Sequence, residues 1–357
     1  MGTSRFTPEY GAEAVRQVTR RRCSAACGGY PGEGKRMKCF RKCLLAGFLA
    51  LGSFSASAAG FAWIRVPADA EGPLLQGAVW YPSAAPPAAF TVTPFTLNVA
   101  KDAPLQGDHL PLVVMSHGTG GSALGHQDTA AALADAGFVV AAINHPGDNA
   151  TDLSQQMHLA PFFSRPRDLT RLISWMTRTW QNASHINDQA VGLFGFSRGG
   201  YTGLVSIGAV PDLKLGKAFC AHQPDLPFCT EIKAPLPPFP PADPRIKAAV
   251  IADPLSVFNA EGLAKIGVPV QLWASEYGGD GVSPESVAAI RKALPQPPEF
   301  YSVTGSGHFS FLAPCPAQLT QSRPEICTDS AGFDRAAFHQ RFNAQVTTFM
   351  RAHLAAP

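Results

Sequence analysis

The stretch that decides the fold is AVGLFGFSRGG, residues 190–200. It opens with an apolar run typical of a buried strand, and its glycines mark the start of a helix. Its second half matches G-x-S-x-G, a pattern in which the serine, here Ser197, stands on a sharp turn between strand and helix. Glycines flank the serine because side chains there would collide with neighbouring backbone. The turn exposes the Ser197 hydroxyl, so the motif in this context predicts a nucleophile rather than an incidental serine.

A serine hydroxyl is a weak nucleophile at neutral pH and needs a general base held in place by the fold. Of the ten histidines, His308 has the position that such a base requires. It lies in GSGHF, residues 305–309, directly after a predicted strand at 300–303 and after Ser197 in the chain. We therefore expect His308 to be the general base.

Three carboxylates are candidates for the acid that orients this histidine. Asp253 directly follows a predicted strand at 246–252. Glu276 and Asp280 follow a predicted strand at 268–274, but Asp280 stands in a glycine-rich stretch that also suits an ordinary turn. The end of either strand could direct a carboxylate at His308.

The oxyanion formed during acyl transfer needs preorganised backbone N–H groups. One donor is expected from Arg198, directly after the nucleophile, and the other from Thr119 in SHGTGG, residues 116–121, which follows a predicted strand at 111–116. Around these donors, four residues are expected to bind substrate: His117, Gly118, His145 and Phe196. The segment NHPGD, residues 144–148, either walls the pocket or is only a turn.

Strands alternate with helices along the chain, which predicts an α/β fold with a mostly parallel central sheet covered by helices on both faces. Further strands are predicted at 76–81, 89–99 and 138–143. Two helices are predicted at 128–136 and 284–293. Three more are predicted to begin near Pro166, which suits a first turn, at Gly199 and at about Asp334. A proline-rich excursion at about 210–244, read as lying over one edge of the sheet, interrupts a single domain that spans 59–357.

The first 58 residues have the features of a leader. From Met37, basic residues precede the apolar stretch 44–54 and the sequence SASA, which ends at Ala58 and suits signal-peptide cleavage. Residues 1–36 are either a long basic extension or an upstream segment outside the true start at Met37. We expect an exported protein, periplasmic or secreted.

The charge distribution bears on possible partners, and the cysteine usage agrees with export. Residues 1–58 hold ten Lys and Arg against three Asp and Glu, whereas residues 59–357 hold nineteen against twenty-three, which disfavours a nucleic-acid partner. No long apolar segment follows residue 58, so no integral membrane segment is expected there. Beyond the leader the cysteines are four, and their separations favour disulfides between Cys220 and Cys229 and between Cys315 and Cys327. A metal site is the poorer interpretation because the spacings do not suit one.

The quoted motifs resemble the α/β-hydrolase superfamily, and more narrowly its platelet-activating-factor acetylhydrolase and bacterial dienelactone-hydrolase-like esterases. The resemblance runs from about Gly77 to the C-terminal helix. In the acetylhydrolases the acid follows the strand that comes after the helix next to the nucleophile, which implies Asp253. Dienelactone hydrolases carry a cysteine nucleophile where this chain has Ser197, which puts their lactone substrate in doubt.

The resemblance implies a serine esterase that acts on small-molecule carboxylic esters, with short acyl groups, through Ser197, His308 and Asp253. Neither a metal nor an organic cofactor is expected. The alternatives are a lactonase or peptidase with the same triad, or a non-catalytic binding protein with this fold. The oligomeric state does not follow from the sequence.

Overall fold

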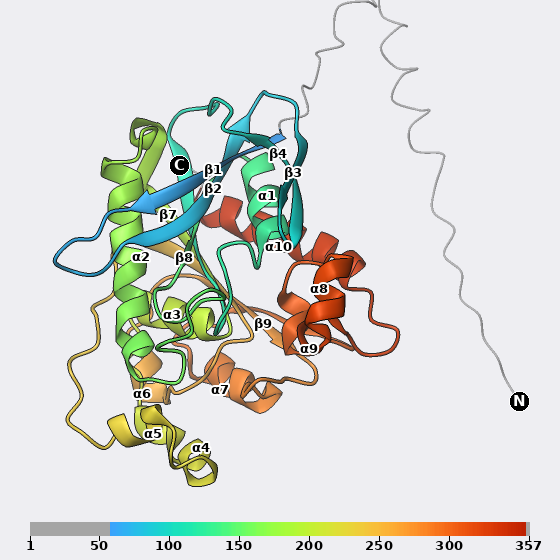
Figure 1. Ribbon diagram of the computed structural model, residues 1–357. Coiled ribbons are helices and arrows are strands. Elements are labelled where there is room, and N and C mark those ends of the chain that lie inside the picture. The colour runs from blue at the N-terminus through green and yellow to red at the C-terminus, as the bar shows by residue number, and fades with distance from the viewer. Residues whose placement is uncertain (1–57, 355–357) are drawn as a thin grey trace, which may run out of the picture. The chain divides into compact units, whose positions relative to one another are not determined.

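The computed structural model describes residues 58–354 (Figure 1). Its centre is a ten-stranded sheet in the order β10-β9-β8-β7-β5-β6-β2-β1-β4-β3. The strands are β1 (Ala58–Val66), β2 (Leu75–Ser83), β3 (Ala88–Val92), β4 (Phe95–Lys101), β5 (Leu110–Ser116), β6 (Val139–Asn144), β7 (Ile186–Phe196), β8 (Ile246–Ala252), β9 (Val270–Ser275) and β10 (Glu299–Val303).

Six neighbouring strands of the sheet run parallel, in the order β10, β9, β8, β7, β5 and β6. Strand β2 pairs antiparallel with both β6 and β1. Central strands are buried on both faces, as the apolar run of β5 illustrates. Leu112 and Val114 contribute to the core on one face, and Val113 and Met115 to the core on the other. This two-faced burial is why the central strands read as continuous apolar runs rather than alternating ones.

Helices cover both faces. On one face lie α1 (Gln127–Asp135) and α10 (Arg335–Leu354), which contact each other; α2 (Ala160–Arg178), α3 (Arg198–Ser206), α6 (Ala260–Leu263) and α7 (Pro284–Ala293) pack on the other. Shorter elements are η1 (Ala183–His185), η2 (Leu213–Gly216), α4 (Lys217–His222), α5 (Pro227–Glu231), η3 (His308–Phe311), α8 (Ala317–Ser322) and α9 (Pro324–Cys327). A mostly parallel sheet between two helical layers confirms the predicted α/β-hydrolase fold.

The first part of the sheet differs from the prediction. Strand β1 was not predicted, and the expected single strand at 89–99 is a hairpin of β3 and β4. Pro94 breaks the run because it has no N–H for the ladder, and the chain reverses between Val92 and Phe95, which pair with each other.

Helix α2 begins at Ala160, so the expectation that Pro166 lies in the first turn was wrong: Pro166 lies inside the helix. An interior proline leaves the carbonyl four residues earlier, that of Phe162, without its helical donor. The hydroxyl of Tyr201 on α3 donates to this carbonyl over 3.1 Å. The contact between α2 and α3 thus compensates the backbone group that Pro166 cannot satisfy.

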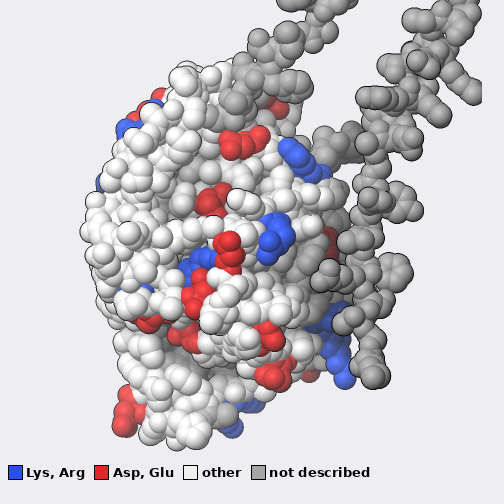
Figure 2. Space-filling model, turned by 90° about the vertical axis from the view of Figure 1, so that its right-hand side faces the viewer, with Lys and Arg blue, Asp and Glu red and all other residues white. Residues whose placement is uncertain are grey.

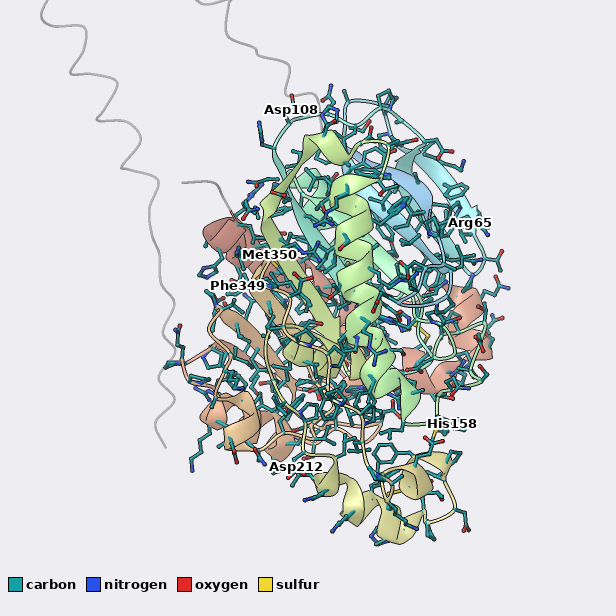
Figure 3. The ribbon with its side chains drawn as sticks, turned by 90° about the vertical axis from the view of Figure 1, so that its left-hand side faces the viewer. Arg65, Asp108, His158, Asp212, Phe349 and Met350 are labelled. Atoms are coloured by element: carbon teal, nitrogen blue, oxygen red, sulfur yellow. A yellow bond between two sulfur atoms is a disulfide. The ribbon has the colours of Figure 1, made fainter. Side chains whose placement is uncertain are left out.

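The excursion at about 210–244 contains η2, α4 and α5, but it does not lie over an edge of the sheet as predicted (Figure 1). It packs against the start of α2, where Phe228 N–H donates to the carbonyl of Met157 and His158 pairs with Glu231 at 2.7 Å. Figure 3 shows His158 at this end of α2, above the excursion helices. The excursion therefore borders the carboxyl ends of the strands rather than an edge strand.

Two disulfides tie down the loops outside the sheet. Cys220 is bonded to Cys229 within the excursion, and Cys315 to Cys327 across α8 and α9. Among residues 58–354, no helix is long and apolar enough to cross a membrane. On the face drawn in Figure 2, basic and acidic side chains are intermingled. The predicted leader, including residues 1–36 and the cleavage signal, lies outside the described residues apart from Ala58.

Candidate active site

Ser197 occupies the turn between β7 and α3 in a strained backbone conformation, with φ 57° and ψ −121°. A positive φ is uncommon for a residue with a Cβ and persists only where surrounding contacts enforce it. Here the Ser197 N–H donates to the Ala252 carbonyl over 3.0 Å, and the Ser197 carbonyl accepts from Leu255 over 3.0 Å. These bonds tie the turn to the end of β8.

The flanking glycines are required by close backbone contacts. A Cβ on Gly195 would lie 2.3 Å from the Gly199 carbonyl oxygen, and one on Gly199 would lie 1.9 Å from the Ser116 carbonyl oxygen. Any side chain at either position would overlap main-chain atoms that cannot move aside. The G-x-S-x-G spacing is therefore a steric condition for the sharp turn.

His308 and Asp253 are 55 residues apart in the chain and are hydrogen-bonded to each other in the structure. His308 begins η3 after β10, and Asp253 follows β8. The His308 Nδ1 lies 2.7 Å from Asp253 Oδ2, and both side chains are 1% exposed. The Asp253 carboxylate also accepts from Ser275, from the N–H at 2.9 Å and the hydroxyl at 2.7 Å. Three hydrogen bonds thus fix the carboxylate and, through it, the imidazole.

The other ring nitrogen of His308, Nε2, is buried and has no hydrogen-bond partner among the described residues. The Phe196 ring stacks on the imidazole with centroids 4.7 Å apart. Ser197 and His308 line one cavity. An imidazole held by a carboxylate on Nδ1, with Nε2 unengaged, has the form of a general base waiting for a proton.

The two alternative carboxylates, those of Glu276 and Asp280, have contacts that differ from those of Asp253. Glu276 accepts from the N–H of Gly305 over 2.5 Å. Asp280 lines the cavities and has φ 48° in a run of glycines, as a turn residue would. Neither is hydrogen-bonded to His308 among the described residues, whereas Asp253 is.

The loop after β5 packs directly against the nucleophile. A Cβ on Gly118 would lie 3.2 Å from the Ser197 Cβ. The N–H groups of Gly120 and Gly121 are taken by Asp148 and by the Gly118 carbonyl, while the Thr119 N–H has no partner in the hydrogen bonds of residues 58–354. Arg198 is the first residue of α3, where an N–H has no intrahelical acceptor. Both predicted oxyanion donors are thus free of helical or turn partners.

Two cavities meet at Ser197, and both also include Thr119 and Asp280. The first, of 390 Å³, is largely apolar and extends to Trp63, the β3–β4 hairpin and the α8–α9 loop. The second, of 570 Å³, is bordered by apolar side chains of the excursion, including Leu215, Phe219 and Phe228. Pockets of this size suit small organic ligands. No local sequence pattern signals the contribution of Trp63 and α8–α9, because only the tertiary fold brings them to the nucleophile.

Of the four predicted substrate-binding residues, His117, Gly118 and Phe196 line the first cavity. His145 does not, and this expectation was wrong. Its side chain is fully buried, with Nε2 3.0 Å from the Ser116 hydroxyl and Nδ1 3.0 Å from Asp168. This Ser-His-Asp arrangement lies inside the protein, where no substrate reaches it.

Burial explains the protonation of these inner groups. Burial and the nearby Arg165 guanidinium together lower the pKa of His117 to about 3. The pKa of His145 is likewise well below its usual value, chiefly through burial, and burial raises the pKa of Asp168 to about 7. Both histidines are therefore neutral at pH 7 and act as hydrogen-bonding scaffold. No cluster of side chains within residues 58–354 could hold a metal ion.

Comparison with known proteins agrees with this geometry. Residues 85–166 match the family described as platelet-activating factor acetylhydrolase, isoform II. A solved ferulic acid esterase from Streptomyces cinnamoneus is similar in structure, with a TM-score of 0.56 and 18% sequence identity over 87% of this chain and 95% of that chain. No curated protein matches the chain. The sheet topology and the structural likeness together show that this chain has the α/β-hydrolase fold.

Proposed function

We propose that this chain is a serine esterase in which Ser197 is the nucleophile, His308 the base and Asp253 the residue that orients the base. The observation that carries this function is the strained Ser197 beside a cavity that also holds His308, whose Nδ1 is bound to Asp253 at 2.7 Å. The acetylhydrolase family match and the esterase neighbour support a carboxylic ester hydrolase.

The chemistry follows from this arrangement. The Ser197 hydroxyl attacks the ester carbonyl and passes its proton to His308 Nε2, which then protonates the departing alcohol. The backbone N–H groups of Thr119 and Arg198 stabilise the oxyanion in both tetrahedral intermediates. Water activated by the same imidazole releases the acid from the acyl-enzyme. No step in this sequence calls on a cofactor.

The two cavities correspond to the two sides of an ester. We assign the acyl group to the smaller cavity, of 390 Å³, and the alcohol part to the larger, of 570 Å³. The preference for short acyl groups rests on the family resemblance, because a cavity of 390 Å³ would also admit a longer chain. An increase of kcat/KM toward long acyl chains would contradict the acyl preference and leave ester cleavage intact.

We also propose that the protein is exported and that its signal peptide is cleaved after Ala58. Two disulfides support it, because such bonds persist in oxidising compartments. Cleavage there would leave residues 59–66 of β1 in the mature protein. Mass spectrometry of the protein recovered outside the cytoplasm should give Ala59 as the first residue.

The deciding experiment compares the purified protein with its Ser197→Ala variant on p-nitrophenyl esters of increasing acyl length. We expect hydrolysis by the first and none above background by the second, with matching circular dichroism spectra. A fluorophosphonate probe should label the unaltered protein alone. Inactivity on every ester with retained labelling would favour amide or lactone substrates, and loss of both would favour a binding protein with this fold.

A further inference from the structure

A completely buried carboxylate, that of Asp148, lies behind the proposed oxyanion site. Its Oδ2 accepts from Arg165 on α2 at 3.1 Å and from Arg198 on α3 at 2.8 Å. Its Oδ1 accepts from the backbone N–H of Gly120 at 3.1 Å. The Asp148 side chain therefore has three donors from three separate segments of the chain.

The segments that Asp148 joins are those that supply the two oxyanion donors. Gly120 directly follows Thr119, and Arg198 both follows Ser197 and carries the second donor on its own backbone. Arg165 extends the connection, because its Nη2 also donates to the carbonyl of His117 at the start of the same loop. One carboxylate thus fixes the separation between the loop after β5 and the start of α3.

The cluster is also unusual electrostatically. Its two guanidiniums and one carboxylate carry a net positive charge in a buried place, and neither arginine side chain is more than 10% exposed. Burying charges is unfavourable unless they are paired and hydrogen-bonded, and apolar residues of similar volume would often be equally stable. Stability alone therefore does not explain the cluster, whereas oxyanion stabilisation requires donors fixed before the reaction.

We infer that Asp148 is a positioning residue that holds the N–H groups of Thr119 and Arg198 in register for the oxyanion. This role rests on the proposed esterase function, but it concerns a residue outside the triad. Asp148 touches no substrate and acts through Gly120 and Arg198. Its loss should therefore weaken the transition state and leave ground-state binding nearly unchanged.

Asp148→Asn tests this role because it keeps the size of the side chain and removes its charge. We expect kcat to fall by about 100-fold, the usual effect of misplacing catalytic groups by about 1 Å, and KM to change by less than about threefold. A short-chain trifluoromethyl ketone, which forms an oxyanion adduct with a serine, should bind less tightly by about the same factor as kcat falls.

Asp243→Asn is the matched control. Asp243 is also a buried carboxylate paired with an arginine, Arg245 at 2.5 Å, but it precedes the amino end of β8, away from Ser197. We expect this variant to lower the thermal unfolding temperature without changing kcat or ketone affinity. If Asp148→Asn does not fold, Arg198→Gln keeps the backbone donor and removes one connection, and it should lower kcat and ketone affinity together.

The outcomes separate the two proposals. If the unaltered protein hydrolyses esters and Ser197→Ala does not, the esterase function stands whatever the Asp148 result. Folded Asp148→Asn protein with wild-type kcat and ketone affinity would overturn the positioning role alone, as would an equal loss of kcat in Asp243→Asn. If the unaltered protein neither hydrolyses esters nor binds the ketone, both proposals fall.

Discussion

Replacing Asp253 by asparagine tests how the base is held. In the structure its carboxylate accepts from the Ser275 N–H, the Ser275 hydroxyl and His308 Nδ1. The asparagine Oδ1 can still accept from the Ser275 N–H. Its amide group would then face Nδ1 as a donor, and the imidazole could satisfy it only by moving its own proton to Nε2. A protonated Nε2 cannot accept the proton of Ser197.

The size of the effect follows from this change of tautomer. We expect kcat to fall by about 10⁴-fold, equivalent to about 5.4 kcal/mol in the activation free energy. KM should stay within about threefold of the unaltered value, because Asp253 lines neither cavity that reaches Ser197. Folding should persist, since the substitution keeps the volume of a buried side chain.

The assay is steady-state hydrolysis of p-nitrophenyl acetate, with thermal unfolding measured on the same samples. Asp280→Asn and Glu276→Gln serve as matched controls, since neither carboxylate is hydrogen-bonded to His308 among the described residues. Both should keep kcat within about threefold. Near-normal turnover in Asp253→Asn together with its loss in Asp280→Asn would refute the assignment of the acid.

Two further predictions concern packing and pH. Gly199→Ala places a Cβ 1.9 Å from the Ser116 carbonyl oxygen and should lower the free energy of unfolding by about 3 kcal/mol or more. Gly267→Ala, whose new Cβ would have no neighbouring atom within 4 Å, should lower the free energy of unfolding much less. Equal urea midpoints for the two variants would contradict the steric argument. Burial lowers the pKa of His126 to about 4, so the unfolded chain, with a histidine pKa near 6.5, binds more protons and stability falls as the pH drops from 6.5 toward 4. Between pH 7 and pH 5 this amounts to about 2 kcal/mol, and His126→Phe should remove that part of the loss in urea titrations at the two pH values.

Local patterns predicted the central elements well. Strand β8 and helix α7 begin and end where the sequence indicated, because each combines an apolar pattern with a clear boundary residue, as Pro284 is for α7. The peripheral elements were less predictable. Pro166 was predicted to lie at a helix start, although it lies inside α2. The Phe162 carbonyl that it leaves without a helical donor accepts from Tyr201 on another helix, and this contact leaves no mark in the local sequence.

For the candidate site, the sequence by itself determined the chemical groups: the G-x-S-x-G turn, the histidine after the last strand and the glycine-rich loop after β5. These are local patterns, because steric limits on a sharp turn act between residues close in the chain. Only the tertiary structure decided which of three carboxylates reaches His308, that His145 is buried scaffold, and that Asp148 joins the two oxyanion segments. Such choices depend on contacts between strand ends that are far apart in sequence, which hydrophobic periodicity does not encode.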